Sequence, residues 1–436
     1  MLEALKRLNS GTIHLGSEST INIANFSCID SAIKSIRPQL PLYCLHPAAL
    51  ANSASAFLAG FPGMTLYAVK SNPDPYVLTK LHSSGIRGFD VASLSEIQLI
   101  HRMFPSAFMA FMNPVKSREA IRSAYFDFGI RAFALDCFEE LEKIKQETNY
   151  ASDLTLLVRL EMPKGSALHP LSSKFGAALD VAPALLSATQ KNSQKVGLAF
   201  HVGSQTQDPA SYAKAIQLCG KVIAESGVRL DILDVGGGFP IRGLGENIPP
   251  LEDFFSVIKR EIQCLNLPDT SQVWGEPGLA LSGESTILVL RVDLRKGDAL
   301  YLNDGGYGAL FDLCWFKRKN NVSLIRAKAP QAFEVRVKPF QFFGPTCDSV
   351  DHIEGPFMLP EDTREGDWIA LHDMGSYAFA MQTGFNGFYS NQKVAIGEAG
   401  SGKAPQPRQK DTSRTPAVPC KSPGLVTASN PRPLPC

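Results

Sequence analysis

The chain has 436 residues, of which 44% are hydrophobic and 19% are charged, and its formal net charge at pH 7 is +1. This composition is typical of a folded globular protein and argues against general disorder. The near-neutral charge argues against broad electrostatic binding of nucleic acid or of an acidic membrane surface, because both need clustered Lys and Arg.

No apolar run approaches the roughly 20 residues that cross a bilayer, and the N-terminal stretch lacks the apolar segment and cleavage pattern of a secretory signal. We therefore expect a cytoplasmic protein without a membrane partner. The nine cysteines are scattered, with no CxxC pair and no His-Cys cluster at ligand spacing. Reduced thiols and no bound metal are the expectation.

Residues 1–40 precede the first strand–helix unit, and we expect this N-terminal segment to contribute to a β domain. Between residues 65 and 277, short apolar runs alternate with stretches of helical apolar spacing. The eight runs are TLYAVKSN, GFDVAS, AFMAFMNP, AFALD, LTLLVRLEM, VGLAFHVGS, LDILDVGGG and QVWGEP. Eight such units predict an α/β fold with a (β/α)8 TIM-like barrel over residues 41–278, because a right-handed crossover returns each strand beside the last.

The chain after residue 280 is rich in β segments and turn signals, without alternating helices. This texture predicts a C-terminal all-β domain over residues 279–393. From about Asn391 the composition turns to Pro, Ser, Lys, Gln and Thr. Residues 394–436 are therefore predicted to be a disordered Pro/Ser-rich tail.

The eight runs end in unusually polar residues. In a barrel of this kind the chemistry lies at the C-terminal ends of the strands. The residues at these ends are Lys70, Asp90, Asn113, Asp136, Arg159, His201 with Ser204, Gly236 to Gly238, and Glu276. Any one of them could be an ordinary residue of the barrel rim, but together they predict an active site.

Lys70 ends a buried run in YAVKSN. Burial lowers the pKa of a lysine towards the neutral amine that attacks a carbonyl group. The alternative is a lysine that reaches from the strand end into solvent. His201, in FHVGS, has two readings as well, because it either stacks on a cofactor ring or forms a hydrogen bond with the backbone.

Glycines follow the last two runs, at Gly236, Gly237 and Gly238 and at Gly278. Barrel enzymes commonly hold a phosphate at this position, and backbone N–H groups approach phosphate oxygens closely where no Cβ intervenes. Glu276 lies in the same segment. In a site for pyridoxal 5'-phosphate (PLP), such a carboxylate pairs with the pyridine nitrogen, so that the ring accepts electrons from the bond being broken.

The motifs YAVKSN, FDVASLSEI, SSKFGA, FHVGSQ, DVGGGFP, EPG, NDGGYG, GPTCDSVD and GSYAFAMQTGFNGF occur in this order. With them the chain resembles the fold-type III PLP-dependent decarboxylases of ornithine, lysine and diaminopimelate, and the eukaryotic-type ornithine decarboxylases in particular, over about residues 25 to 393. The resemblance implies an alanine racemase-like fold, a PLP cofactor and the decarboxylation of L-ornithine to putrescine in polyamine biosynthesis.

The resemblance also assigns roles within the cofactor site. Lys70 matches the lysine that binds PLP covalently, Glu276 the partner of the pyridine nitrogen, and His201 the histidine that stacks on the ring. Further matches are Ser204, Gly238 and Tyr377 as phosphate contacts, and Asp90, Glu96 and Arg159 as the polar surroundings of the ring and the lysine.

Three residues match the family's substrate-binding and proton-donating groups. Cys347 resembles the cysteine that returns a proton to the substrate's α-carbon, and in this family it reaches the site from the other subunit. A homodimer with shared active sites is therefore implied. Asp304 and Asp348 match the carboxylates that grip the distal amine, an arrangement that favours a diamino acid over a neutral one.

Leu279 departs from the family, which almost always has Arg after EPG as a partner of the cofactor phosphate. Losing that guanidinium could cost on the order of 1.5 to 3 kcal/mol of cofactor affinity, the range of a charged hydrogen bond. Two alternatives therefore stay open beside ornithine. One is a decarboxylase of lysine or of another diamino acid in a specialised pathway, and the other is a non-catalytic homologue similar to the antizyme inhibitors.

Overall fold

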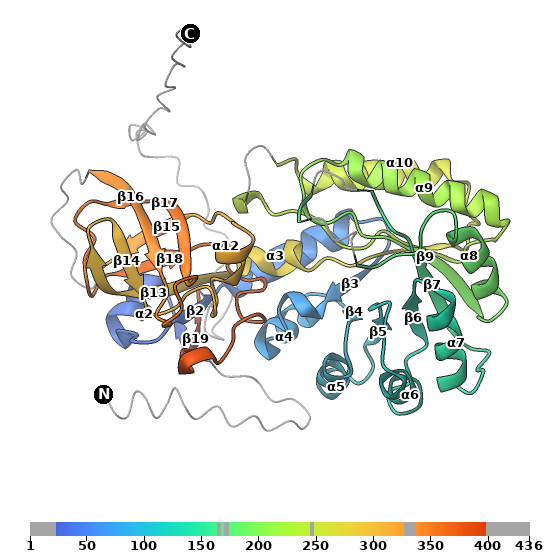
Figure 1. The fold of residues 1–436 in the computed structure, drawn as a ribbon, viewed down its shortest axis with the longest axis horizontal. Helices are drawn as coiled ribbons and strands as arrows, with labels where there is room; N and C mark the ends of the chain where they lie inside the picture. Colours follow the sequence, from blue (N-terminus) through green and yellow to red (C-terminus); the bar gives the residue numbers. More distant parts are fainter. Residues whose placement is uncertain (1–22, 164–166, 170–173, 245–247, 327–335, 398–436) are drawn as a thin grey trace, which may run out of the picture. The chain divides into compact units, whose positions relative to one another are not determined.

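The structure is a computed structural model that describes residues 23–163, 167–169, 174–244, 248–326 and 336–397. These residues form a closed barrel of eight strands and a sheet of nine strands, with a further sheet of two short strands (Figure 1). Most of the predicted tail and the first 22 residues lie outside the described residues. Within the described ranges, no helix has the length and apolar character needed to traverse a bilayer.

The barrel strands coincide with the eight predicted runs, and all of them pair in parallel. The strands are β3 (Met64–Ala68), β4 (Gly88–Val91), β5 (Phe108–Phe111), β6 (Ala132–Leu135), β7 (Thr155–Arg159), β9 (Lys195–Ala199), β11 (Ile232–Asp234) and β12 (Gln272–Gly275). The barrel closes where β12 pairs with β3, with Trp274 beside Met64. The predicted (β/α)8 barrel is confirmed.

Helices follow the barrel strands along the chain and bury apolar side chains against them. They are α4 (Pro75–Ser83), α5 (Leu94–Met103), α6 (Arg118–Phe126), α7 (Phe138–Glu147), α8 (Ala182–Gln190), α9 (Ala210–Ser226), α10 (Leu251–Cys264) and the short α11 (Leu279–Ser282). Local signals fix where several begin. The Asp74 carboxylate accepts a hydrogen bond from the N–H of Tyr76 at the start of α4, and Ser93 caps α5 in the same way.

The second sheet is mostly antiparallel and is assembled from both ends of the chain. Its strands are β1 (Asn25–Phe26), β2 (Leu42–Leu45), β13 (Thr286–Lys296), β14 (Ala299–Leu302), β15 (Val322–Ile325), β16 (Val337–Phe343), β17 (His352–Pro360), β18 (Trp368–Leu371) and β19 (Lys393–Ile396). Strand β2 lies between β13 and β19. The predicted second, mostly β sheet is confirmed, and its strand β2 falls within the segment expected to be barrel.

Several further elements lie outside the barrel strands, their helices and the nine-stranded sheet. They are α2 (Ile29–Ile36), α3 (Pro47–Gly60), α12 (Phe311–Trp315), and the two paired strands β8 (Ala167–His169) and β10 (Ser204–Thr206). Helix α3 leads from β2 to the first barrel strand. Its Phe57 is fully buried, and the ring lies 5.0 Å from those of Phe239 and Phe255. This aromatic cluster joins α3 and α10 to the segment that follows β11.

Candidate active site

Lys70 and Asp90 form an ion pair at the C-terminal end of the barrel. Lys70 lies in a single 3₁₀ turn, Val69–Ser71, directly after β3, and Asp90 lies in the neighbouring strand β4. The Lys70 Nζ is 2.9 Å from Asp90 Oδ2, and the lysine side chain is 45% exposed whereas Asp90 is 2% exposed. Partial removal from water opposes charge on Lys70, but Asp90 and then Glu276 raise its pKa above the usual value. The expected lowering of the Lys70 pKa is therefore wrong for the chain alone.

Two further acids stand at the ends of the adjacent strands β11 and β12. Asp234 is fully buried, and its Oδ1 accepts a hydrogen bond of 2.8 Å from the Gly236 N–H. Burial raises the pKa of Glu276 well above its usual range, and the carboxyl of Asp234 raises it further. Asp234 is not among the predicted site residues, because only the glycines of DVGGGFP suggest a phosphate contact. Its position at a strand end would have identified it.

His201 follows β9 and is held by the backbone. Its Nδ1 accepts a hydrogen bond of 3.0 Å from the Gly203 N–H, so the neutral ring carries its proton on Nε2. Burial lowers the pKa of His201 well below its usual value, and Arg159 and Lys70 lower it further. Both readings of this histidine stay compatible with the geometry, because a backbone hydrogen bond also fixes the plane of the ring.

Arg159 contacts an aromatic ring, whereas Glu96 forms a hydrogen bond with the backbone. Arg159 ends β7, and its guanidinium carbon lies 5.5 Å from the centre of the Phe175 ring. The Glu96 carboxylate turns back to accept a hydrogen bond of 2.7 Å from the N–H of Ala92, ahead of helix α5. Glu96 therefore fixes the segment that leads from Asp90 into helix α5.

The triple glycine after β11 is required by packing. A Cβ on Gly236 would lie 2.1 Å from the Phe200 carbonyl oxygen, and one on Gly238 would lie 2.3 Å from that of Gly203. The Tyr212 hydroxyl donates a hydrogen bond of 2.8 Å to the Gly237 oxygen and fixes the loop from behind. The loop thus backs closely onto the segment that leads into β10 and Ser204. Its bare backbone suits the close approach of a phosphate.

Leu279 does not point towards solvent. The side chain is 8% exposed and packs against Ile241 in a small apolar cluster beside α11. Gly278 precedes it, and a Cβ there would lie 2.8 Å from the Ser71 Cβ. Close packing therefore accounts for this glycine as well.

Three fully buried serines form a triangle of hydroxyl groups behind this region. The Ser71 Oγ lies 3.0 Å from that of Ser282 and 2.9 Å from that of Ser376, and the last two are 2.8 Å apart. Tyr377, next to Ser376, has a positive φ of 66°, and its N–H donates a hydrogen bond of 2.8 Å to the backbone carbonyl oxygen of Ser71. The chain segments of Lys70, Leu279 and Tyr377 are thus joined to one another.

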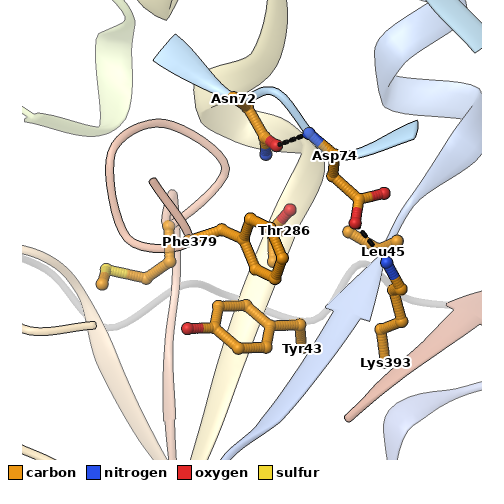
Figure 2. A pocket seen from close by; sticks show the side chains of 8 residues that line it. Tyr43, Leu45, Asn72, Asp74, Thr286, Phe379 and Lys393 are labelled. Atoms are coloured by element: carbon orange, nitrogen blue, oxygen red, sulfur yellow. Dashed lines mark hydrogen bonds and ion pairs between the residues drawn. The ribbon is translucent and has the colours of Figure 1, made fainter. Parts of the chain in front are cut away.

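A second set of contacts ties the segment after Lys70 to the nine-stranded sheet (Figure 2). The Asn72 side chain donates a hydrogen bond of 2.7 Å to the Gly375 oxygen, and Asn72 Oδ1 accepts one of 3.0 Å from the Asp74 N–H. Asp74 in turn forms an ion pair with Lys393 of β19. These side chains line a cavity of about 10 Å³, which is on the order of one water molecule.

The residues predicted to bind substrate lie in loops of the nine-stranded sheet. Both carboxylate oxygens of Asp304 accept backbone hydrogen bonds, of 2.8 Å from Gly305 and 3.1 Å from Ala309. Asp348 accepts a hydrogen bond of 2.5 Å from the Tyr307 hydroxyl, and this bond and the Val350 N–H lower the pKa of Asp348. Asp304 therefore holds its own loop together, whereas Asp348 is an ionised surface carboxylate.

Cys347 is exposed beside Asp348, and its N–H donates a hydrogen bond of 3.2 Å to Asn386 Oδ1. The sequence reasoning missed Asp351, which accepts hydrogen bonds from the Gly306 N–H at 2.6 Å and from the Thr346 hydroxyl at 2.7 Å. Asp351 thereby joins NDGGYG to GPTCDSVD. Within the described chain, no hydrogen bond or ion pair links Cys347 or Asp348 to Lys70.

Comparisons with known proteins agree with this arrangement. Residues 48–283 match the family described as "Pyridoxal-dependent decarboxylase, pyridoxal binding domain". The chain is 34% identical over 345 residues to ornithine decarboxylase of Schizosaccharomyces pombe, covering 76% of this chain and 77% of that protein. It is 33% identical over 334 residues to the lysine/ornithine decarboxylase of Selenomonas ruminantium, covering 74% and 81%.

Among solved structures, the lysine/ornithine decarboxylase of Vibrio vulnificus complexed with cadaverine superposes with a TM-score of 0.72 at 30% identity, covering 86% of this chain and all of that chain. The residues present fit a PLP group, because an amine, a buried acid pair and a bare glycine loop meet at the mouth of the barrel. The chain therefore belongs to the family of fold-type III, PLP-dependent amino acid decarboxylases that includes ornithine decarboxylase.

Proposed function

We propose that the chain decarboxylates L-ornithine to putrescine, with L-lysine as a second substrate. The observation that carries the proposal is the ionised Asp348 carboxylate, held by Tyr307 next to Cys347. A carboxylate so placed suits the distal ammonium of a diamino acid through a charge-assisted hydrogen bond. Lysine is retained because a relative at 33% identity is named a lysine/ornithine decarboxylase.

In this proposal each residue of the cofactor site has a distinct role. Bound PLP supplies the electron sink for the bond that breaks. The Lys70 amine would hold the cofactor, and in the structure Asp90 positions this amine with a hydrogen bond of 2.9 Å. The neutral His201 would pack on the ring of PLP, and Glu276 would accept a hydrogen bond from the pyridine N–H. The N–H groups of Gly237 and Gly238, with Ser204 and Tyr377, would bind the phosphate, while the Gly236 N–H donates to Asp234 and fixes the start of the loop.

Cys347 is the proposed proton donor to the substrate's α-carbon, and we place it in the active site of a second copy of the chain. Its surroundings support a protein contact there. Val350, Phe385 and Phe388 are large apolar side chains near it, and they are 47%, 41% and 42% exposed. Apolar surface of this kind is stabilised when a partner covers it. The proposed assembly is a homodimer with two shared sites.

The direct test is CO2 release from a panel of ornithine, lysine, arginine and diaminopimelate, with amine products identified by mass spectrometry. Putrescine from ornithine, formed with the highest kcat/KM of the panel, is the expected result. The proposal of ornithine fails if another amino acid is preferred by tenfold or more. Asp348→Asn should raise KM for ornithine more than it lowers kcat, whereas Asp298→Asn, at an exposed acid elsewhere on the sheet, should change neither.

Borohydride reduction of the PLP-treated chain followed by peptide mapping separates an enzyme from a non-catalytic homologue. A pyridoxyl group on Lys70 is expected. Absence of any label from protein that is folded and saturated with PLP would favour the antizyme-inhibitor-like alternative.

A further inference from the structure

Asp234 presents an unusual combination of burial and missing partners. The residue is fully buried, and Oδ1 accepts the Gly236 N–H at 2.8 Å. The second oxygen, Oδ2, is also buried and has no hydrogen-bond donor among the described residues. A buried carboxylate oxygen without a partner is destabilising by about 1–3 kcal/mol or more, so such an atom needs an explanation.

Burial raises the pKa of Asp234, whereas a hydrogen bond between the Asp234 and Glu276 side chains lowers it. Two ionised carboxylates cannot form one, because neither has a hydrogen to donate. Two like charges about 4 Å apart also repel by roughly 4 kcal/mol at an intermediate dielectric constant. One proton between the two acids removes both problems, since it gives Asp234 Oδ2 a partner and halves the charge of the pair.

Other charged groups around the pair do not remove the need for this proton. The negative charge of Asp90 raises the pKa of both Asp234 and Glu276. The positive charge of Lys70 lowers the pKa of both, and that of Arg159 lowers the pKa of Glu276. Lys70 is already within 2.9 Å of Asp90. His201 packs against the same loop, with its Nε2 3.1 Å from where a Gly237 Cβ would lie, and it is neutral. Burial raises the pKa of both acids.

The backbone keeps the two acids together. Asp234 ends β11 opposite Trp274 of β12, and the Glu276 N–H donates a hydrogen bond of 2.8 Å to the Gly236 oxygen. The residues that carry the two carboxyls are therefore held by the pairing of β11 with β12 and its continuation.

We infer that the Asp234–Glu276 pair carries a single proton in a hydrogen bond between the two carboxyls, and that Asp234 is a positioning residue which would hold this proton on Oδ2 and donate it to Glu276 when PLP is bound. This deepens the proposed function and rests on it, because Glu276 then keeps its negative charge and one free oxygen for the pyridine N–H of PLP. No proton leaves the site when the cofactor binds. Asp234 holds the proton, Glu276 accepts from both sides, and the charge of the pair stays at −1.

Asp234→Asn is the decisive variant, since an amide accepts the Gly236 N–H through Oδ1 and donates to Glu276 through Nδ2 without titrating. Asp234→Ala is its matched control and removes both bonds. We expect the apo Asn variant to bind PLP within about threefold of wild type in a fluorescence titration, and the Ala variant to bind at least tenfold more weakly. PLP affinity of the wild type should fall as alkaline pH removes the shared proton, whereas the Asn variant should lack this fall.

Infrared difference spectra of the apo proteins test the proton without any cofactor. The wild type at pH 7 should show the C=O stretch of a neutral carboxylic acid that is missing from Asp234→Asn. Absence of that band overturns the inference, as does an Asn variant that is folded but binds PLP as weakly as the Ala variant. Failure of wild type to bind PLP would overturn the proposed function instead, and the infrared result would still decide the protonation of the pair.

Discussion

At the scale of single residues, Leu279 gives the clearest expectation. It occupies the position where the family has Arg, and it is 8% exposed against Ile241. Leu279→Arg should strengthen PLP binding by roughly ten- to a hundredfold, because a charged hydrogen bond to the phosphate contributes about 1.5–3 kcal/mol. Titration of the apo protein measures the effect. Leu279→Met keeps the apolar packing and should leave the Kd unchanged. Equal affinity of the Arg variant and wild type would show that another group already neutralises the phosphate.

The buried pair of Lys116 and Glu140 predicts a pH effect on stability. Their charged atoms are 3.0 Å apart, and burial lowers the pKa of Lys116 to about 8 from an ordinary 10.5. Between these values the unfolded chain binds more protons than the folded one, so this pair makes the folded protein more stable as pH rises from about 8 to about 10.5. Urea unfolding at several pH values should show this rise in wild type and lose most of it in Lys116→Met with Glu140→Gln. An identical slope in both proteins would assign the rise to other groups.

Residue types at strand ends were predictable, but their charge states were not. The sequence pattern placed Lys70, Asp90 and Glu276 at neighbouring ends, since a parallel barrel brings all such ends together. It could not give the ion pair of 2.9 Å between Lys70 and Asp90, which raises rather than lowers the lysine pKa. Nor could it show that Asp304 is used by its own loop, because that depends on backbone conformation.

At the scale of elements, the serine triangle links the turn after β3, helix α11 and the segment before Tyr377. Ser282→Ala removes one of the three hydroxyls and should destabilise the apo protein by about 1–3 kcal/mol, because two buried hydrogen-bonding groups lose a partner. The shift of the urea midpoint measures this. Ser83→Ala, at an exposed hydroxyl on α4, should change stability by no more than about 0.5 kcal/mol. A Ser282→Ala midpoint equal to that of wild type would contradict a stabilising role for the triangle.

The barrel strands were predictable because the strand–helix pattern repeats eight times, whereas β2 and β19 of the nine-stranded sheet belong to no such repeat. All eight barrel runs became strands, because each is a short apolar run followed by a helix. Strand β2 is also short and fully buried, so sequence alone could not separate it from the barrel that follows. Strand β19 runs from Lys393 to Ile396 and so extends into residues 394–436, where composition predicted a tail. A strand of four residues has too short an apolar pattern to be recognised beside polar neighbours. The proposed domain boundaries stay predictions.

At the scale of the whole molecule, the proposed homodimer with shared active sites predicts complementation. Lys70→Ala and Cys347→Ala should each be inactive alone, yet a mixture allowed to exchange subunits should regain about one quarter of wild-type activity. Half of the dimers are then mixed, and each mixed dimer has one intact site. The same mixture assayed before exchange is the control. No recovery in dimers shown to be mixed would place each site within a single subunit.

The order of strands in the nine-stranded sheet has a consequence for synthesis. Strand β2 pairs with β13 on one side and β19 on the other, and among the described residues β1 pairs only with β19. All eight barrel strands pair with one another, and they lie between residues 64 and 275. The barrel can therefore close during synthesis while β1 and β2 are still unpaired. Among the described strands, β19 is synthesised last, and it pairs with both β1 and β2. A nascent chain released before Lys393 would therefore leave an edge of β1 and an edge of β2 unpaired and open to other chains.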